Sequence, residues 1–379
     1  MKKPIKLFAI TVLFSCNGTD GETSSNILEN LTLTVDTVVV DPKSEIIDLS
    51  FGVNNSSVSS DGSTFYHFDI KQRLINSVNL DKLELAGIHQ FSKEGPNSIG
   101  FNPPRIQSLP NDRILFASNG FGVGVYDLSG EKQKNLKFNF REIEGLNYEE
   151  EGLITNHAVV SEDERHLFAL SMFDPSLSEA KLIVVDPEQK TGKTITLPVM
   201  KQALESIILW RAPGSFSRGP GGINLQLLNG KLYVISSVTS DVYQYDFGSD
   251  SLVLIEFPHR LVHSKKTGEF KNLVSSEKEF FEEMGKVIYQ IGFEKLLWDE
   301  ERKQFFRFAL EPIPDEERKW YDRAEVYLFV YDSDLNLLGE KHLPQLSKVP
   351  EFPFFKDGKL WSYVNVDDEL GFAVITFNF

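Results

Sequence analysis

The chain has 379 residues, of which 41% are hydrophobic and 25% are charged, a composition close to that of soluble globular proteins. These proportions exclude a disordered chain, a collagen and a multispan membrane protein. Acidic residues outnumber basic residues by 55 to 39, and the resulting net charge of −16 argues against nucleic-acid binding as the main role. The single cysteine excludes an intramolecular disulfide and a cysteine-built zinc site.

The first residues have the form of a bacterial signal peptide. Lysines precede an apolar run over residues 7–14, which is too short to span a bilayer. The only cysteine, Cys16, follows this run, and residues 13–16 (Leu-Phe-Ser-Cys) resemble the lipobox of bacterial lipoproteins. In such signals the cysteine is acylated and becomes the new N-terminus. We therefore expect a signal peptide over residues 1–15 and a lipid on Cys16.

A polar segment rich in Gly, Ser and Thr follows, over residues 17–30. This composition is typical of a flexible tether. The sequence thus predicts three parts: the signal peptide 1–15, a tether 16–30 that carries the lipid, and a single folded domain 31–379. No later segment reaches 18 uninterrupted apolar residues, so the lipid is the only membrane attachment that we expect.

From residue 31 onward, short apolar runs alternate with turn residues, which indicates an all-β domain. One unit of four strands recurs at intervals of roughly 50 to 70 residues, the signature of a propeller blade. Its copies cover residues 53–80, 106–138, 157–197, 223–257, 291–343 and 352–379. The first turn of each copy lies at Asp61, Asp112, Asp163, Asn229, Glu300 and Asp357. We therefore expect a six-bladed β-propeller, with loop insertions in the longer intervals.

The two ends of the chain are predicted to meet in the last blade. The sixth copy supplies about three strands, whereas residues 32–41 alternate like a strand and belong to no copy. The N-terminal strand could therefore complete the last blade and close the ring, which would leave no long exposed edge. A pair of β-sandwiches is the competing all-β architecture. It should show a domain break near the middle of the chain, and none is visible.

Two insertions have sequences of their own. Residues 276–279 (Ser-Glu-Lys-Glu) have the form of a capping box, and apolar residues follow at helical spacing up to residue 288. They predict a short helix packed on one face of the ring. The acidic segment 141–152 is expected to be a solvated loop.

The lipobox, the tether and the repeats together resemble the uncharacterised six-bladed β-propeller lipoproteins of Bacteroidetes-type bacteria. Residues 93–100 (Lys-Glu-Gly-Pro-Asn-Ser-Ile-Gly) and 219–223 (Gly-Pro-Gly-Gly-Ile) look like the segments that lead into an innermost strand in this family. The resemblance implies a propeller fold and a location in the cell envelope. It implies no activity.

Motifs of common catalytic and metal sites are missing from the sequence. There is no Gly-x-Ser-x-Gly elbow, no His-Glu-x-x-His motif and no EF-hand spacing. His259 and His263 have the i, i+4 spacing of a zinc pair, but Pro258 disfavours a helix there, so we expect an ordinary loop. Sequence alone cannot choose a carboxylate pair for glycoside hydrolysis among 55 acidic residues. No catalytic residue, metal or cofactor is therefore predicted.

Any ligand is expected at the mouth of the central channel, where the innermost strands of a propeller begin. Polar residues at these strand starts and on the approaching loops are the candidates. They are Glu94, Arg105, Asn156, His157, Trp210, Arg211 and Asn224. The same side chains could equally hydrogen-bond channel water and loop backbone.

The sequence favours a lipid-anchored recognition or scaffolding module of the cell envelope, whose partner is an envelope protein, a small ligand or a glycan. One alternative is a propeller hydrolase or lyase that acts on glycans or lactones through channel-facing carboxylates or a metal. Another is a sensor that reports the state of the envelope to a membrane protein. The expected location is the outer membrane, facing the periplasm, and surface exposure stays open because the acidic run after Cys16 is thin.

Overall fold

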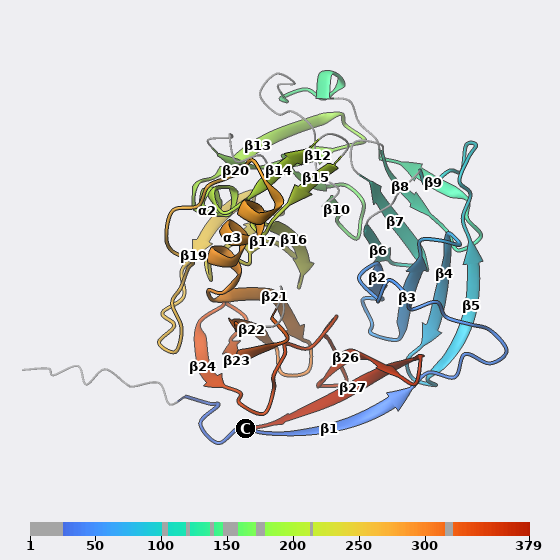
Figure 1. Ribbon diagram of the computed structural model, residues 1–379. Coiled ribbons are helices and arrows are strands. Elements are labelled where there is room, and N and C mark those ends of the chain that lie inside the picture. Colours follow the sequence, from blue (N-terminus) through green and yellow to red (C-terminus); the bar gives the residue numbers. More distant parts are fainter. Residues whose placement is uncertain are drawn as a thin grey trace, which may run out of the picture.

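Figure 1 shows the computed structural model, in which strands dominate and the sheets stand around a common axis, as in a β-propeller. The structure describes residues 26–100, 105–118, 122–136, 140–146, 158–171, 179–212, 215–314 and 321–379. The predicted all-β class is therefore confirmed. The predicted signal peptide 1–15 and Cys16 lie outside the described residues.

Within the described residues, six sheets of four antiparallel strands follow one another along the chain. Sheet 1 contains β2 (Ser56–Val58), β3 (Thr64–Asp69), β4 (Leu74–Asn79) and β5 (Glu84–Gln90). Sheet 2 contains β6 (Arg105–Leu109), β7 (Arg113–Ser118), β8 (Gly122–Tyr126) and β9 (Lys132–Asn135). Sheet 3 contains β10 (Val159–Val160), β11 (Leu167–Leu170), β12 (Ala180–Asp186) and β13 (Thr191–Leu197). The first three predicted repeat units correspond to these sheets.

The other three sheets correspond to the later repeat units. Sheet 4 contains β16 (Ile223–Leu228), β17 (Lys231–Ser236), β18 (Val242–Asp246) and β19 (Ser251–Ile255). Sheet 5 contains β21 (Gly292–Asp299), β22 (Gln304–Ile313), β23 (Arg323–Tyr331) and β24 (Leu337–His342). Sheet 6 contains β25 (Phe354–Lys356), β26 (Lys359–Val366), β27 (Glu369–Asn378) and β1 (Thr32–Val39).

The first and last strands of the chain lie side by side (Figure 1). β1 pairs with β27 in antiparallel register, from Thr32 opposite Asn378 to Val39 opposite Gly371. The N-terminal strand expected over residues 32–41 therefore exists and adds the outer strand of the last sheet.

Neighbouring sheets share hydrophobic clusters. One cluster joins sheets 1 and 2, and four further clusters join each following pair of sheets up to sheets 5 and 6. A sixth joins sheet 6 to sheet 1 and contains Phe65, Val78, Trp361 and Phe372. Because a middle strand buries both faces, its sequence reads as an apolar run. In β22, for example, Phe305 packs toward sheet 4 and Phe306 toward sheet 6.

Acidic and Asn residues form the hairpin turns after the innermost strands, as their spacing predicted. Asp112, Asn229 and Asp357 have φ angles of 54°, 47° and 51°, a left-handed conformation that Asn and Asp adopt more readily than most residues. At the corresponding turn of sheet 1, the backbone N–H of Ser63 donates to Asp61 Oδ1 at 3.0 Å.

An insertion of mixed structure flanks sheet 4. It contains η2 (Pro198–Met200), α2 (Lys201–Glu205), β14 (Leu209–Ala212), β15 (Ser215–Arg218), β20 (Leu273–Val274) and α3 (Glu277–Ile288). The three strands form a small sheet in the order β15-β14-β20, which sequence analysis did not predict. α3 packs its buried Phe280, Met284 and Val287 against this sheet.

The predicted helix is α3, and its cap has the expected kind of residue. Ser276 Oγ accepts a hydrogen bond from the backbone N–H of Glu279 at 3.2 Å. The Glu279 carboxylate in turn accepts from the backbone N–H of Ser275, one residue before the cap. The segment 141–152 begins within η1 (Phe140–Glu142), and its residues 147–152 lie outside the described residues. No helix in the described part of the chain is long and apolar enough to cross a bilayer.

We expect Phe372→Ala to destabilise the protein by about 3–5 kcal/mol, because the Phe372 ring is fully buried where sheets 6 and 1 meet. Its ring centroid lies 5.4 Å from that of Phe65 and 5.7 Å from that of Trp361. Urea unfolding measures the effect. Phe379→Ala is the control, since Phe379 is 43% exposed and should change little. A loss below about 1 kcal/mol for Phe372→Ala would contradict this account of the core.

Candidate functional site

The innermost strands of neighbouring sheets are connected by side-chain hydrogen bonds close to the axis. The Gln107 amide on β6 donates to the Val160 carbonyl at 2.8 Å and accepts from the Val160 N–H at 3.0 Å. The Gln226 amide on β16 does the same with Leu296 on β21, at 3.0 Å in both directions. Each amide thus supplies the two hydrogen bonds that a neighbouring strand would supply within a sheet.

A β-bulge interrupts the innermost strand of sheet 5 just before Leu296. Phe293 lies opposite Ala309 and Leu296 lies opposite Arg307, so two residues of β21 face one residue of β22. These two residues are Glu294 and Lys295. Bulges often re-aim side chains next to functional sites. Here the bulge places an acidic and a basic side chain next to each other at the start of an innermost strand.

The buried side chain of Arg307 supports this bulge. Arg307 has no exposed surface, and its Nε donates to the Glu294 carbonyl at 2.8 Å. Its other nitrogens donate to two carbonyls of sheet 4. These are the carbonyl of Ser236 at the end of β17, at 3.3 Å, and that of Ser240 in the turn that follows β17. The guanidinium carbon also lies 5.1 Å from the centroid of the Phe293 ring. Burial lowers the pKa of Arg307 to about 10, which leaves it charged at neutral pH.

Arg105, the first residue of β6, extends from sheet 2 to sheet 4. Its Nη2 donates to the Leu225 carbonyl of β16 at 3.0 Å. It therefore passes the short inner strand of sheet 3, β10, and connects two sheets that are not neighbours. Burial lowers the pKa of Arg105 to about 10. Among the described residues, no carboxylate forms an ion pair with it.

We call Arg105, Glu294, Lys295 and Tyr321 the channel cluster, because their charges influence one another. Lys295 is exposed to solvent, but desolvation by the protein atoms around it and the Arg105 charge lower its pKa, and Glu294 opposes this effect. Burial raises the pKa of Glu294, against the influence of Lys295 and Arg307. Burial and the Glu294 charge raise the pKa of Tyr321. Titratable groups whose pKa values perturb one another mark a candidate binding site.

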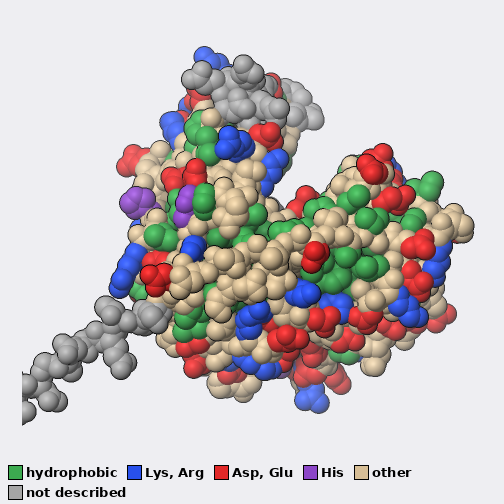
Figure 2. All heavy atoms as spheres, turned by 90° about the horizontal axis from the view of Figure 1, so that it is seen from below, with side chains coloured by type: hydrophobic (Ala, Val, Ile, Leu, Met, Phe, Trp, Pro, Cys, Tyr) green, Lys and Arg blue, Asp and Glu red, His purple; other side chains and the backbone are tan. Residues whose placement is uncertain are grey.

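One face of the molecule is hollowed in the edge-on view of Figure 2, between two raised parts. Hydrophobic side chains line the flanks of the hollow, and charged side chains of both signs gather on the opposite face. A ligand could therefore approach the ring from the hollowed face.

The structure brings two of the sequence-predicted residues together. Asn224 precedes Leu225 on β16, and Leu225 is the residue whose carbonyl Arg105 binds. Glu94 lies on the exposed connection between β5 and β6. Asn156 and His157 lie outside the described residues.

Trp210 and Arg211 lie on β14 in the insertion and not on an innermost strand. The Trp210 ring packs against Phe280 of α3, with centroids 6.5 Å apart. The Arg211 guanidinium carbon lies 5.8 Å from the centroid of the exposed Phe216 ring. Sequence analysis grouped them with the channel because they precede the fourth repeat. They pair instead with β15 and, through Trp210, with Val274 of β20.

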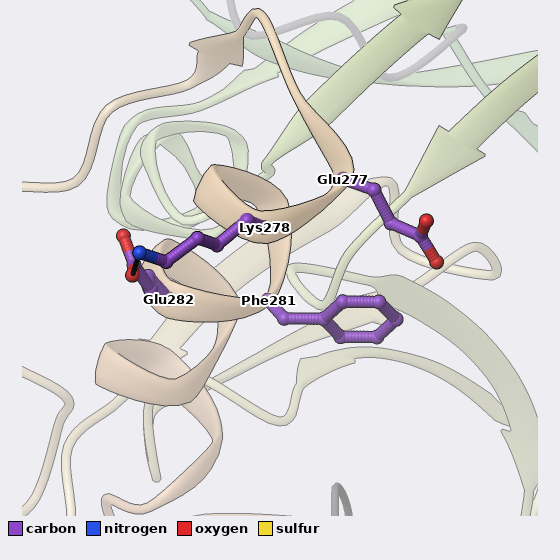
Figure 3. Close-up of a pocket in the computed structure, with 4 residues that line it drawn as sticks. All are labelled: Glu277, Lys278, Phe281 and Glu282. Carbon is purple, nitrogen blue, oxygen red and sulfur yellow. Dashed lines mark ion pairs between the residues drawn. The ribbon is translucent and has the colours of Figure 1, made fainter.

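A pocket of about 460 Å³ lies beside α3 (Figure 3). Its lining residues Glu277, Lys278, Phe281 and Glu282 all belong to this helix. Lys278 and Glu282 form an ion pair at 3.6 Å on its surface. Among the described residues, no side chain from another element lines this pocket, so the channel cluster is the better candidate site.

His259 and His263 lie in a loop, as expected, and differ in their surroundings. His259 Nε2 lies 2.9 Å from the Tyr331 hydroxyl, and its ring stacks on Phe257 with centroids 5.4 Å apart. His263 is exposed. The described residues contain no group of three His, Cys, Asp or Glu side chains that could hold a metal ion.

Sequence analysis missed Glu294, Lys295, Tyr321 and Arg307. Arg307 carried a usable signal, because it is a lone charge in the apolar run Phe-Phe-Arg-Phe-Ala-Leu over residues 305–310. The bulge left a weaker signal, since β21 contains no proline and its one glycine, Gly292, lies at the start of the strand, two residues before Glu294.

We expect Arg307→Met to destabilise the protein by about 3 kcal/mol or more, because three buried carbonyls would lose their donor. Chemical denaturation measures the loss. Arg165→Met is the matched control, since the Arg165 side chain is 74% exposed. Equal effects of the two substitutions would show that Arg307 does not support the bulge.

His259 should make the protein less stable in acid. Its folded-state pKa is lowered by burial to about 3, whereas the unfolded side chain titrates near 6.5, so the unfolded state binds more protons between these values. Stability therefore falls as the pH decreases from about 6.5 toward 3. His259→Gln should remove about 2 kcal/mol of the loss between pH 7 and 4.5, measured by urea unfolding at each pH. His263→Gln is the control, and an unchanged pH dependence for both variants would refute the assignment.

Comparison with known proteins gives a family without a known function. The chain matches the domain of unknown function DUF4221 over residues 24–342. A solved structure of a DUF4221 member from Bacteroides vulgatus is 14% identical, with a TM-score of 0.66 over 92% of this chain and 98% of that chain. A second structure, named "Putative exported protein", from Bacteroides fragilis, is 11% identical, with a TM-score of 0.51 over 94% and 98%.

The curated proteins offer no significant match. At such low sequence identity, the similarity to these two structures shows the fold alone. The family match covers most of the chain, and the fold agrees with it. The chain belongs to the DUF4221 family.

Proposed function

We propose that the protein is an exported, lipid-anchored six-bladed β-propeller that binds a small ligand in its central channel at the cell envelope. The observation that carries the binding function is the channel cluster. Arg105 from sheet 2 and the Glu294–Lys295 bulge from sheet 5 converge near the axis.

Six blades and a closed ring are the finer form of the fold that we propose. Six four-stranded sheets, a first strand paired with the last, and a hydrophobic cluster between sheets 6 and 1 all support it. In such a ring the innermost strands enclose a shared channel, and the sheets keep only short, protected edges.

Export and lipid anchoring rest on the sequence of residues 1–16, with Cys16 as the acylated residue. One structural relative carries the name of an exported protein, which agrees with this assignment. More than one acyl chain makes anchoring stable, as a lipoprotein cysteine would provide. The outer membrane, with the domain facing the periplasm, is the location that we propose.

Catalysis is the second candidate, and one observation favours it. Glu294 is a partly buried carboxyl whose pKa is raised, as a general acid requires. A hydrolase or lyase acting on glycans or lactones would use it beside Lys295. Glycoside hydrolysis, however, needs two carboxyl groups that flank the scissile bond, and the channel cluster contains one. Binding without chemistry is therefore the better supported function.

The proposal is tested by purifying the tagged full-length protein from detergent-solubilised envelopes. We expect the wild-type protein in the membrane fraction, and a small molecule released from it on denaturation and detected by mass spectrometry. Cys16→Ala should leave the membrane fraction and still carry the molecule, because the lipid and the channel are separate.

Arg105→Ala should stay in the membrane fraction and lose the molecule, since it removes the guanidinium at the channel. An envelope protein retained in near-equal amount, with no small molecule, would favour a scaffold instead. The same small molecule retained at equal amount by Arg105→Ala would place the site elsewhere.

A further inference from the structure

Two basic residues, Arg105 and Lys295, are linked through β16 at the proposed channel. The Arg105 guanidinium holds the carbonyl of Leu225 at 3.0 Å. The next residue, Gln226, exchanges two hydrogen bonds with Leu296, which directly follows Lys295. The contacts from Arg105 through β16 to β21 therefore connect the guanidinium of sheet 2 with the backbone that directly follows Lys295 in sheet 5. The electrostatic influence of Arg105 on Lys295 agrees with this placement.

Among the described residues, the Glu294 carboxylate offsets one of these two positive charges, which leaves one charge for a ligand anion. Neither Arg105 nor Lys295 forms an ion pair among these residues, and Arg105 donates one hydrogen bond. Two like charges held close together in a protein channel are costly, and a bound anion would relieve the cost. A planar guanidinium matches the two oxygens of a carboxylate, and an ammonium beside it adds a second charged donor.

Glu294 restricts what else the ligand can carry. It neighbours Lys295 in the bulge, and burial raises its pKa. A second negative charge on the ligand would be repelled by its carboxylate, which disfavours phosphate and other compact polyanions. Ligand hydroxyls, in contrast, can donate to Glu294 and exchange hydrogen bonds with the Tyr321 hydroxyl.

We propose that the ligand is a small carboxylate rich in hydroxyl groups, the class to which uronic acids belong. Arg105 and Lys295 bind its carboxylate, and Glu294 accepts hydrogen bonds from its hydroxyls. This inference rests on the proposed binding function and specifies its ligand class.

Calorimetric titration of the full-length protein with D-glucuronate, D-glucose and inorganic phosphate tests the assignment. Glucuronate should bind at least about tenfold more tightly than glucose, which has similar hydroxyls and no carboxylate, and more tightly than phosphate. Arg105→Ala and Lys295→Met should each remove this preference, whereas Lys295→Arg should keep it. Lys82→Met is the matched control, because Lys82 is an exposed lysine in the turn before β5.

Each result separates this inference from the proposed function. Equal affinity for glucose and glucuronate, or tighter binding of phosphate, would overturn the carboxylate class and leave the binding function in place. If none of the three probes binds but a small molecule still co-purifies with the wild-type protein and not with Arg105→Ala, the ligand class is wrong and the binding function stands. If none of the probes binds and no small molecule co-purifies, the ligand class and the binding function are both wrong. Should Arg105→Ala fail to fold, Lys295→Met carries the test, because Lys295 is accessible to solvent and makes no hydrogen bond among the described residues.

Discussion

Within the described residues, neighbouring sheets share no continuous backbone hydrogen-bond ladder, and other interactions must hold the sheets together. Far from the axis, apolar side chains on both faces of the middle strands hold the sheets together. Near the axis, side-chain amides supply hydrogen bonds between the innermost strands of different sheets, as those of Gln107 and Gln226 do. Polar side chains along the channel therefore have a structural role. A binding site additionally requires charged side chains that are not used in these structural contacts.

Charged side chains of this kind occur at the bulge of β21. The extra residue leaves the Glu294 carbonyl without a strand partner, and a fully buried arginine supplies the missing donor. Arg307 thus has a structural task, whereas Arg105 and Lys295 keep donors for something else. Burial makes both assignments energetically significant, because a charge inside a protein must be satisfied by neighbours or by a ligand.

Sequence reasoning reached the parts that repeat. The spacing of Asp112, Asn229 and Asp357 marked the hairpins, since each needs a left-handed turn conformation after an innermost strand. Sequence reasoning failed where a strand pairs with a segment far away in the sequence. Leu273 and Val274 pair with β14, which precedes them by more than sixty residues in the sequence. Because β14 belongs to the small sheet of the insertion, Trp210 packs against α3 and does not line the channel. Arg105 could be predicted as a channel residue because it begins a strand. Its partner Leu225 could not be predicted, because the contact depends on how sheets 2 and 4 are placed in space.

The central claim is that Arg105 and Lys295 bind a carboxylate at the axis of a closed ring. A crystal structure of the protein grown with D-glucuronate tests it most directly. We expect the sugar in the channel, with its carboxylate within hydrogen-bond distance of both side chains and one of its hydroxyls donating to Glu294. Glucuronate bound away from the axis, or a channel filled by the protein's own side chains, would contradict it.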